Sequence, residues 1–130
     1  MTVRMTRLEG MKSKAEYDGL EVISGRVDRE SKPEGMSPGR LMTAALGLCV
    51  AMHIASYLKR HGVEVEDLSL TVKTRSERNP SRAMEFNIEV CLQVHLDEKQ
   101  RAALIAEMGR CYVTNTLKAV PKINISLKTL

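Results

Sequence analysis

The stretch from Ser37 to Gly62 constrains this 130-residue chain more than any other, because it carries both ends of one helix. Ser37 can cap a helix N-terminus, and Pro38 suits the first helical position. The basic run 59–61 complements the negative end of a helix dipole, and Gly62 can adopt a left-handed cap. Residues 41–52 are apolar on nearly every side, which is typical of a buried helix. Twelve such residues are too few to span a bilayer, so we expect a core helix.

The flanking segments predict strands and a second helix. Three short strands precede the central helix, with turns at Gly10 and at Asp18-Gly19, the latter a strong hairpin signal. Two alternating strands follow the helix, joined by a turn at residues 78–81. Asp97 and Gln100 form a capping-box pattern. The expected ranges are 2–8, 11–17 and 20–24 for the first three strands, 68–73 and 84–96 for the next two, Asp97 to Val120 for the second helix with a bend at Gly109, and 123–127 for a last strand.

The order of these elements is three strands, buried helix, two strands, helix, strand. Such an order predicts the α+β class rather than alternating βαβ units. The chain shows no internal repeat and no linker long enough to divide it. We therefore expect one domain over residues 1–130.

Composition excludes several classes of protein. The net charge of +4, from 20 Lys+Arg and 16 Asp+Glu, favours anionic partners only weakly. Aromatic residues are scarce and Phe86 has the phase of a core residue, so no nucleic-acid partner is expected. The three histidines show no metal-binding spacing, so no metal is expected. The N-terminus lacks the apolar region of a signal peptide, which predicts a cytoplasmic protein.

The reactive candidates are three cysteines, an odd number that argues against a structural disulfide framework. Cys49 lies in the central helix beside Gly47, so another element must pack closely there. Cys111 lies in the second helix. Either could be a small core residue, because free cysteine is among the most buried residue types. Cys91 falls on the polar face of its strand, where we expect a surface thiol without a role.

Two motifs carry a resemblance to a known family. The first is SPGRLMTAALGLCVA, around Pro38 and Cys49, and the second is RCYVTNTL, around Cys111. With the order of strands and helices, they resemble the OsmC/Ohr family of osmotically inducible and organic-hydroperoxide-resistance proteins. The segment SERNP at residues 76–80 is similar to the hairpin of one OsmC-like subgroup. The resemblance covers essentially the whole chain.

The resemblance implies an intertwined homodimer, with two sheets around central helices, and a thiol peroxidase without metal or organic cofactor. In that chemistry Cys49 attacks the peroxide and becomes a sulfenic acid. Cys111 then condenses with it to form a disulfide, which avoids over-oxidation. An aliphatic, Met-rich lining suits an organic hydroperoxide, and a small or protein dithiol would reduce the disulfide. No membrane partner is expected.

Two places depart from the family pattern. Family peroxidases carry a glutamate early in the central helix, where this chain has Gly39 and Arg40. They also carry an arginine in the first hairpin, where this chain has Lys12 and Lys14.

These departures leave open which cation would stabilise a thiolate at Cys49. Arg40 precedes Cys49 by nine residues, which is about 13 Å of helix rise and too far for direct contact. Lys12, Arg26 and a basic residue of a partner subunit are the alternatives. The rival hypothesis is a non-catalytic OsmC-like protein that binds a small apolar ligand or senses oxidation.

Overall fold

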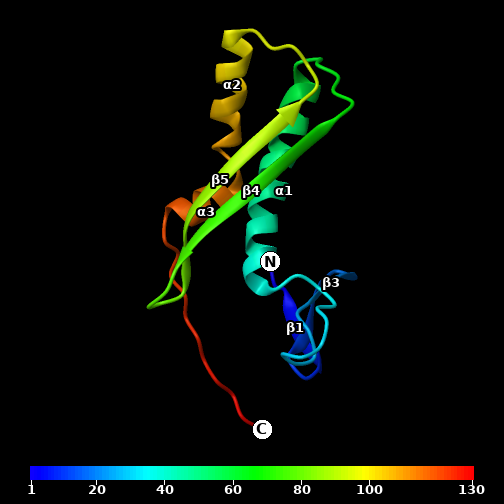
Figure 1. The fold of residues 1–130 in the computed structure, drawn as a ribbon, viewed down its shortest axis with the longest axis vertical. Coiled ribbons are helices and arrows are strands. Elements are labelled where there is room, and N and C mark those ends of the chain that lie inside the picture. The colour runs from blue at the N-terminus through cyan, green and yellow to red at the C-terminus, as the bar shows by residue number, and fades with distance from the viewer. The chain divides into compact units, whose positions relative to one another are not determined.

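The computed structural model describes all 130 residues, in two compact units, Met1–Ala44 and Ala45–Leu130. The elements are three strands, one long helix, two long strands and two short helices (Figure 1). This mixture belongs to the α+β class that the sequence predicts. The single domain expected from the length stays a prediction.

The first unit contains a three-stranded antiparallel sheet whose strands follow sequence order. Its turns fall where the sequence predicts, and both require positive φ angles. The φ angle is 55° at Gly10, 48° at Asp18 and 81° at Gly19, a region that glycine enters without steric cost. The strands are β1 (Arg4–Glu9), β2 (Lys12–Tyr17) and β3 (Leu20–Ser24).

The segment after β3 folds back along the sheet. The N–H of Met11 donates to the Val27 carbonyl at 2.9 Å, and the hydroxyl of Ser24 donates to the Met36 carbonyl at 2.9 Å. Lys12 forms an ion pair with Glu34 at 3.1 Å within this unit. The segment is therefore tied to the strands by main-chain and side-chain bonds.

Helix α1 (Pro38–Arg60) has the ends that the sequence predicts. The N–H of Arg40 donates to the Ser37 hydroxyl at 3.4 Å, as expected for a cap. At the other end Gly62 has a φ of 67°, and the N–H of Val63 donates to the Leu58 carbonyl at 2.9 Å. The left-handed glycine thus turns the chain back over the last helical turn.

By length and composition α1 could cross a membrane, since one 18-residue window has a mean hydropathy of 1.7. The core helix of a soluble protein passes the same test. Four buried residues spaced by four positions run along its length: Leu46, Val50, Ile54 and Leu58. This stripe packs on the sheet of the second unit. The expected burial on nearly every side is therefore seen on one face of α1 only, since 28% of the apolar window is buried and Leu48 and Met52 are exposed.

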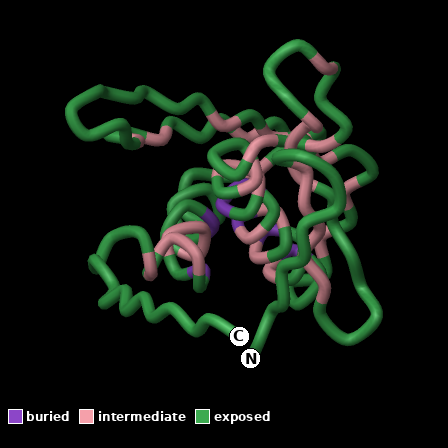
Figure 2. Tube along the Cα trace, turned by 90° about the horizontal axis from the view of Figure 1, so that it is seen from below, coloured by how far each residue is buried: buried purple, intermediate pink, exposed green.

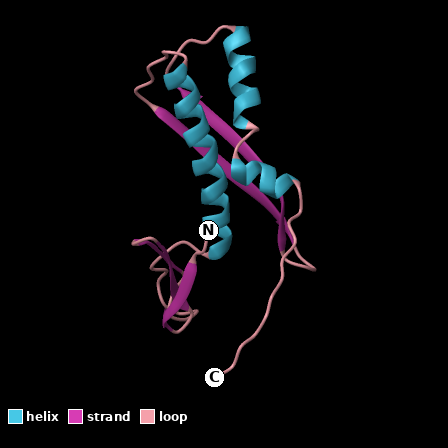
Figure 3. Ribbon diagram, turned by 180° about the vertical axis from the view of Figure 1, so that it is seen from behind, coloured by secondary structure: helices cyan, strands magenta, loops and turns pink.

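The second unit has two layers. Strands β4 (Leu68–Glu77) and β5 (Arg82–Leu92) pair antiparallel, and the helices lie against one face of this hairpin (Figures 1 and 3). Buried residues gather where α1 meets the shorter helices (Figure 2). The core contains the α1 stripe, Leu104 and Cys111, with Leu70, Val72, Phe86 and Val90 packed against it from the strands.

Strand β5 is shorter than predicted. The alternation continues to Leu96, but the strand ends at Leu92. Leu92 pairs with Leu68, the first residue of β4, so the next residues have no strand beside them. A strand needs a partner for its main-chain groups, and apolar alternation alone does not extend it.

The predicted second helix is two helices, α2 (Glu98–Met108) and α3 (Tyr112–Lys118). The capping box at Asp97 and Gln100 is confirmed, with both reciprocal bonds present. The expected bend at Gly109 is a break, because Cys111 is extended, with a ψ of 153°, and becomes the N-cap of α3. The break places the Cys111 sulfur over the first turn of a new helix.

The predicted last strand is wrong for the single chain. Residues 121–130 form neither helix nor strand. The side chains of Ile123, Ile125 and Leu127 are 77%, 92% and 88% exposed. No strand of this chain pairs with the segment, and an unpaired strand is not stable in water.

Candidate functional site

Cys49 lies in α1, two residues after Gly47, where the helix packs closely on the sheet. Leu46, Gly47 and Val50 of this helix are buried, whereas Cys49 is half-buried. A Cβ atom at Gly47 would lie 3.1 Å from side-chain carbons of both Leu70 and Val72. The small residue therefore permits this close packing, as the sequence predicts.

Cys111 lies opposite Cys49, at the break between α2 and α3. Its side chain is fully buried, with 0% exposure. Its Sγ accepts a hydrogen bond from the N–H of Thr114 at 3.3 Å and lies 2.7 Å from the Thr114 hydroxyl. The Cys49 thiol also hydrogen-bonds to it. The structure thus brings together the two cysteines that the family resemblance singles out, both as free thiols.

The surroundings of Cys111 favour its thiolate. Burial raises the pKa of the thiol, because a charge is poorly solvated in the core. Hydrogen bonds from the Thr114 hydroxyl, the Thr114 N–H, the Cys49 thiol and the Val113 N–H lower it further than burial raises it. The pKa of Cys111 therefore lies below that of an ordinary cysteine.

A carboxylate with several basic side chains around it lies four residues before this cysteine. Glu107, with a side chain only 17% exposed, contacts His53 at 3.5 Å, Arg60 at 3.3 Å and Arg110 at 3.8 Å. His53 and Arg60 belong to α1, so Glu107 ties the end of α2 to the central helix. His53 follows Cys49 by four residues, which puts the two on the same face of α1.

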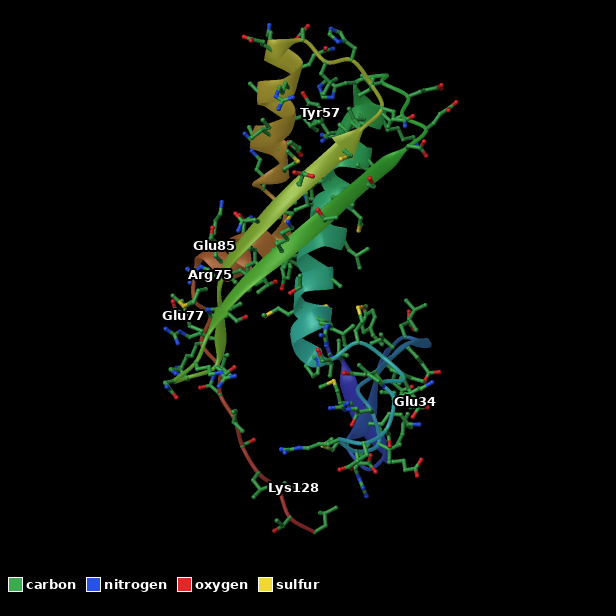
Figure 4. The ribbon with its side chains drawn as sticks, in the orientation of Figure 1. Glu34, Tyr57, Arg75, Glu77, Glu85 and Lys128 are labelled. Carbon is green, nitrogen blue, oxygen red and sulfur yellow. The ribbon has the colours of Figure 1, made fainter.

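The remaining candidates do not join this site. Cys91 is exposed on β5, as expected for its strand phase. Two arginines of the β4–β5 hairpin are paired with glutamates: Arg75 contacts Glu77 at 3.0 Å and Glu85 at 3.1 Å (Figure 4), and Arg82 contacts Glu77 at 3.5 Å. No group of three or more His, Cys, Asp or Glu side chains is arranged to hold a metal ion.

A groove of about 700 Å³ lies beside the C-terminal end of α1. Neither cysteine lines it. Its walls are formed by Ala55, Leu58, Lys59, Gly62, Val63, Glu64, Val65, Glu66 and Leu68.

Sequence reasoning missed two features of the site. Thr114 stands three residues after Cys111, the spacing at which a helix N-cap meets the side chain and N–H of the N3 residue. A helix start predicted at Cys111 would have predicted this contact with Thr114. The Glu107 cluster joins residues far apart in the chain, and no local pattern announces it.

Comparison with known proteins identifies the family. The sequence pattern of the family described as OsmC-like protein matches residues 30–126. The chain belongs to the OsmC-like family. The match includes both cysteines of the site.

Solved OsmC-like structures share the fold. An OsmC-like protein from Mycoplasma pneumoniae is 18% identical, with a TM-score of 0.77, over 92% of this chain and 87% of that one. An OsmC-like hydroperoxide resistance protein from Jannaschia is 22% identical, with a TM-score of 0.61, over 98% and 91%.

An organic hydroperoxide resistance protein OsmC from Legionella pneumophila is 19% identical, with a TM-score of 0.60, over 92% of this chain and 90% of that one. At these identities the likeness establishes the fold. No curated protein matches the sequence.

Proposed function

We propose that this OsmC-like protein is a thiol-dependent hydroperoxide reductase acting on organic hydroperoxides, with Cys49 attacking and Cys111 resolving. The observation that carries the proposal is the contact between the two thiols, of which Cys49 is half-buried and Cys111 fully buried. A peroxide entering from solvent therefore meets Cys49 first. Two solved relatives named for hydroperoxide resistance support the same reading.

The reaction has three steps. The Cys49 thiolate attacks the outer peroxide oxygen, the O–O bond breaks, and the alkoxide leaves and is protonated to the alcohol. The resulting sulfenic acid is attacked by the Cys111 thiolate, which forms the disulfide and releases hydroxide. A dithiol then supplies two electrons and two protons, and both cysteines return to thiols.

The preference for an organic peroxide follows from the surroundings of Cys49. Both cysteines belong to a hydrophobic cluster that also contains Val50, Leu70 and Val72. On α1, Leu48 and Met52 are exposed by 66% and 72% and flank Cys49. Apolar surface of this kind favours an alkyl or aryl group over the small, polar hydrogen peroxide.

The proposal includes a homodimer in the cytoplasm, with a small or protein dithiol as reductant. A partner subunit is one source of the cation that would stabilise the Cys49 thiolate. Within the chain, Lys12 is paired with Glu34 at 3.1 Å and Lys14 with Glu21 at 3.0 Å.

The test is dithiol-dependent loss of cumene hydroperoxide, compared with hydrogen peroxide. Cys49→Ser should abolish turnover, because a serine hydroxyl is hardly ionised near neutral pH. Cys111→Ser should complete the first turnover as a sulfenic acid and then stop through over-oxidation. Cys91→Ser is the matched control and should turn over as the wild type does.

A binding or sensing protein is the second candidate. It is favoured by Gly39 and Arg40, which stand where family peroxidases carry a glutamate. Wild-type protein that consumes neither peroxide faster than Cys49→Ser would establish this second candidate over the reductase.

A further inference from the structure

The Thr114 hydroxyl lies 2.7 Å from the Cys111 sulfur, closer than the Thr114 N–H at 3.3 Å. We infer that Thr114 is a positioning residue that holds Cys111 as a thiolate, ready to close the disulfide. The inference deepens the proposed function by assigning the residue that controls the second step. The group that carries this role is the Thr114 hydroxyl, rather than the main-chain N–H groups at the start of α3.

Besides the Val113 N–H, three groups can donate to this buried sulfur. They are the Thr114 hydroxyl, the Thr114 N–H and the Cys49 thiol. A thiolate has no proton and accepts from all three, whereas a thiol must also place its own proton. Because the Cys111 side chain is fully buried, no water contributes to this balance. The lowered pKa of Cys111 agrees with the same geometry.

The charged groups near Cys111 lie outside this set of donors. Arg110 precedes it and is paired with Glu107, which also holds His53 and Arg60 of α1. The hydrophobic residues Leu70, Val72, Phe86 and Val90 of β4 and β5 pack against the core that contains Cys111. Cys49 is the titratable group that hydrogen-bonds to Cys111. Removing the Thr114 hydroxyl should therefore change the pKa of Cys111 and leave the ion pairs of Glu107 in place.

Removing the hydroxyl should change the pH dependence of disulfide closure in a characteristic way. Losing a hydrogen bond to the thiolate lowers the thiolate-to-thiol ratio on the order of tenfold. A thiolate of higher pKa is also more nucleophilic, with a Brønsted coefficient of about 0.4–0.5. At low pH these effects combine to slow closure about threefold, and at high pH the greater nucleophilicity speeds it about threefold. The profiles of the two proteins should therefore cross.

Closure can be measured without peroxide, which separates this inference from the proposed function. In a Cys91→Ser background, the chromogenic disulfide DTNB reacts with the half-buried Cys49 and releases one coloured thiolate. The Cys111 thiolate then attacks the Cys49 sulfur of the mixed disulfide, forms the Cys49–Cys111 bond and expels a second coloured thiolate. The rate of this second release is the readout, followed across pH.

Thr114→Val removes the hydroxyl and keeps the shape and the N–H. Thr116→Val is the matched control, because the Thr116 hydroxyl lies on the same helix and donates to the Tyr112 carbonyl at 2.8 Å instead of to sulfur. Thr114→Ser restores a hydroxyl. We expect crossing profiles for Thr114→Val and wild-type-like profiles for the other two.

Equal slowing of Thr114→Val at every pH would overturn the inference, as would the same change in Thr116→Val. If Thr114→Val does not fold, Thr114→Ala removes the same hydroxyl and must show the same crossing. A crossing profile in a protein that consumes no peroxide would reject the reductase and keep the role of Thr114. Normal peroxide turnover without crossing profiles would reject the role of Thr114 and keep the reductase.

Discussion

Gly47 determines how closely the central helix approaches the sheet. The carbons of Leu70 and Val72 would lie 3.1 Å from a Cβ at this position, which is tighter than ordinary van der Waals contact. Glycine normally weakens a helix interior by about 0.5–1 kcal/mol relative to alanine. Its presence in the middle of α1 is explained by the sheet that packs on it, and it lies two residues from Cys49.

A larger side chain at this position should therefore destabilise the protein. We expect Gly47→Val to lower the free energy of unfolding by about 1–3 kcal/mol, the cost of overpacking a core. Gly39→Val is the control, since a Cβ at Gly39 has no neighbour within 4 Å. Urea unfolding of the three proteins measures the difference. Equal stability of the two variants would mean that α1 can move away from the sheet without cost.

At the scale of single residues, sequence reasoning predicted Cys49 and Cys111 as the reactive pair, which stays a prediction, and missed the contacts that surround them. Both cysteines stand in short motifs with small or polar neighbours, and such motifs are local. The bond from Thr114 depends on a helix beginning at Cys111, and the contacts of Glu107 depend on α1 and α2 meeting in space. Neither can be read from spacing along the chain.

At the scale of elements, α2 depends on its N-terminal cap. The Asp97 carboxylate accepts from the N–H of Gln100 at 2.7 Å, and the Gln100 side chain accepts from the N–H of Asp97 at 3.0 Å. Only Leu104 of this helix is fully buried. A short helix with so little buried surface relies more on its cap than a core helix does.

Loss of this cap should be measurable. Asp97→Ala should destabilise the protein by about 1 kcal/mol, the usual effect of losing an N-cap side chain. Asp97→Asn keeps an acceptor and should cost only part of that. The check is thermal unfolding followed by circular dichroism, with Glu98→Ala as a neighbouring control. A fully wild-type Asp97→Ala protein would show that packing of Leu104 alone holds α2.

Element ends were predicted well where a cap or turn residue defines them. Pro38, Gly62 and Asp97 are such residues, and the helices begin and end beside them. Predictions failed where a boundary depends on a partner strand. Leu92 ends β5 because β4 begins opposite it, and the alternating segment at 123–127 finds no strand in its own chain.

At the scale of the whole molecule, the single chain leaves much apolar surface uncovered. Leu48 and Met52 on α1 and Ile123, Ile125 and Leu127 near the C-terminus are each more than 60% exposed and together exceed what isolated surface residues explain. We propose that a second copy of the chain covers most of this surface and leaves the approach to Cys49 open. The C-terminal segment would then gain the strand partner that it lacks, as the family resemblance implies.

Sedimentation velocity at micromolar concentration should show a dimer for the wild-type chain. Replacing Ile123, Ile125 and Leu127 together by asparagine keeps the length and removes the apolar face, so this variant should sediment as a monomer. Replacing Lys122 and Lys128 by glutamine is the control and should leave the dimer intact. A wild-type monomer would remove the proposal, and a dimeric asparagine variant would limit the interface to α1.

The difference in exposure between the two sulfurs has a consequence for the ageing of the protein. Cys49 is half-buried and Cys111 has no exposed surface, so damage that accumulates over a molecule's lifetime falls unevenly on the pair. Irreversible sulfinic and sulfonic acids form at a sulfur that meets oxidant repeatedly. Old molecules should therefore carry these lesions at Cys49 and an intact Cys111, and the proportion of doubly modified protein should stay low however long the exposure.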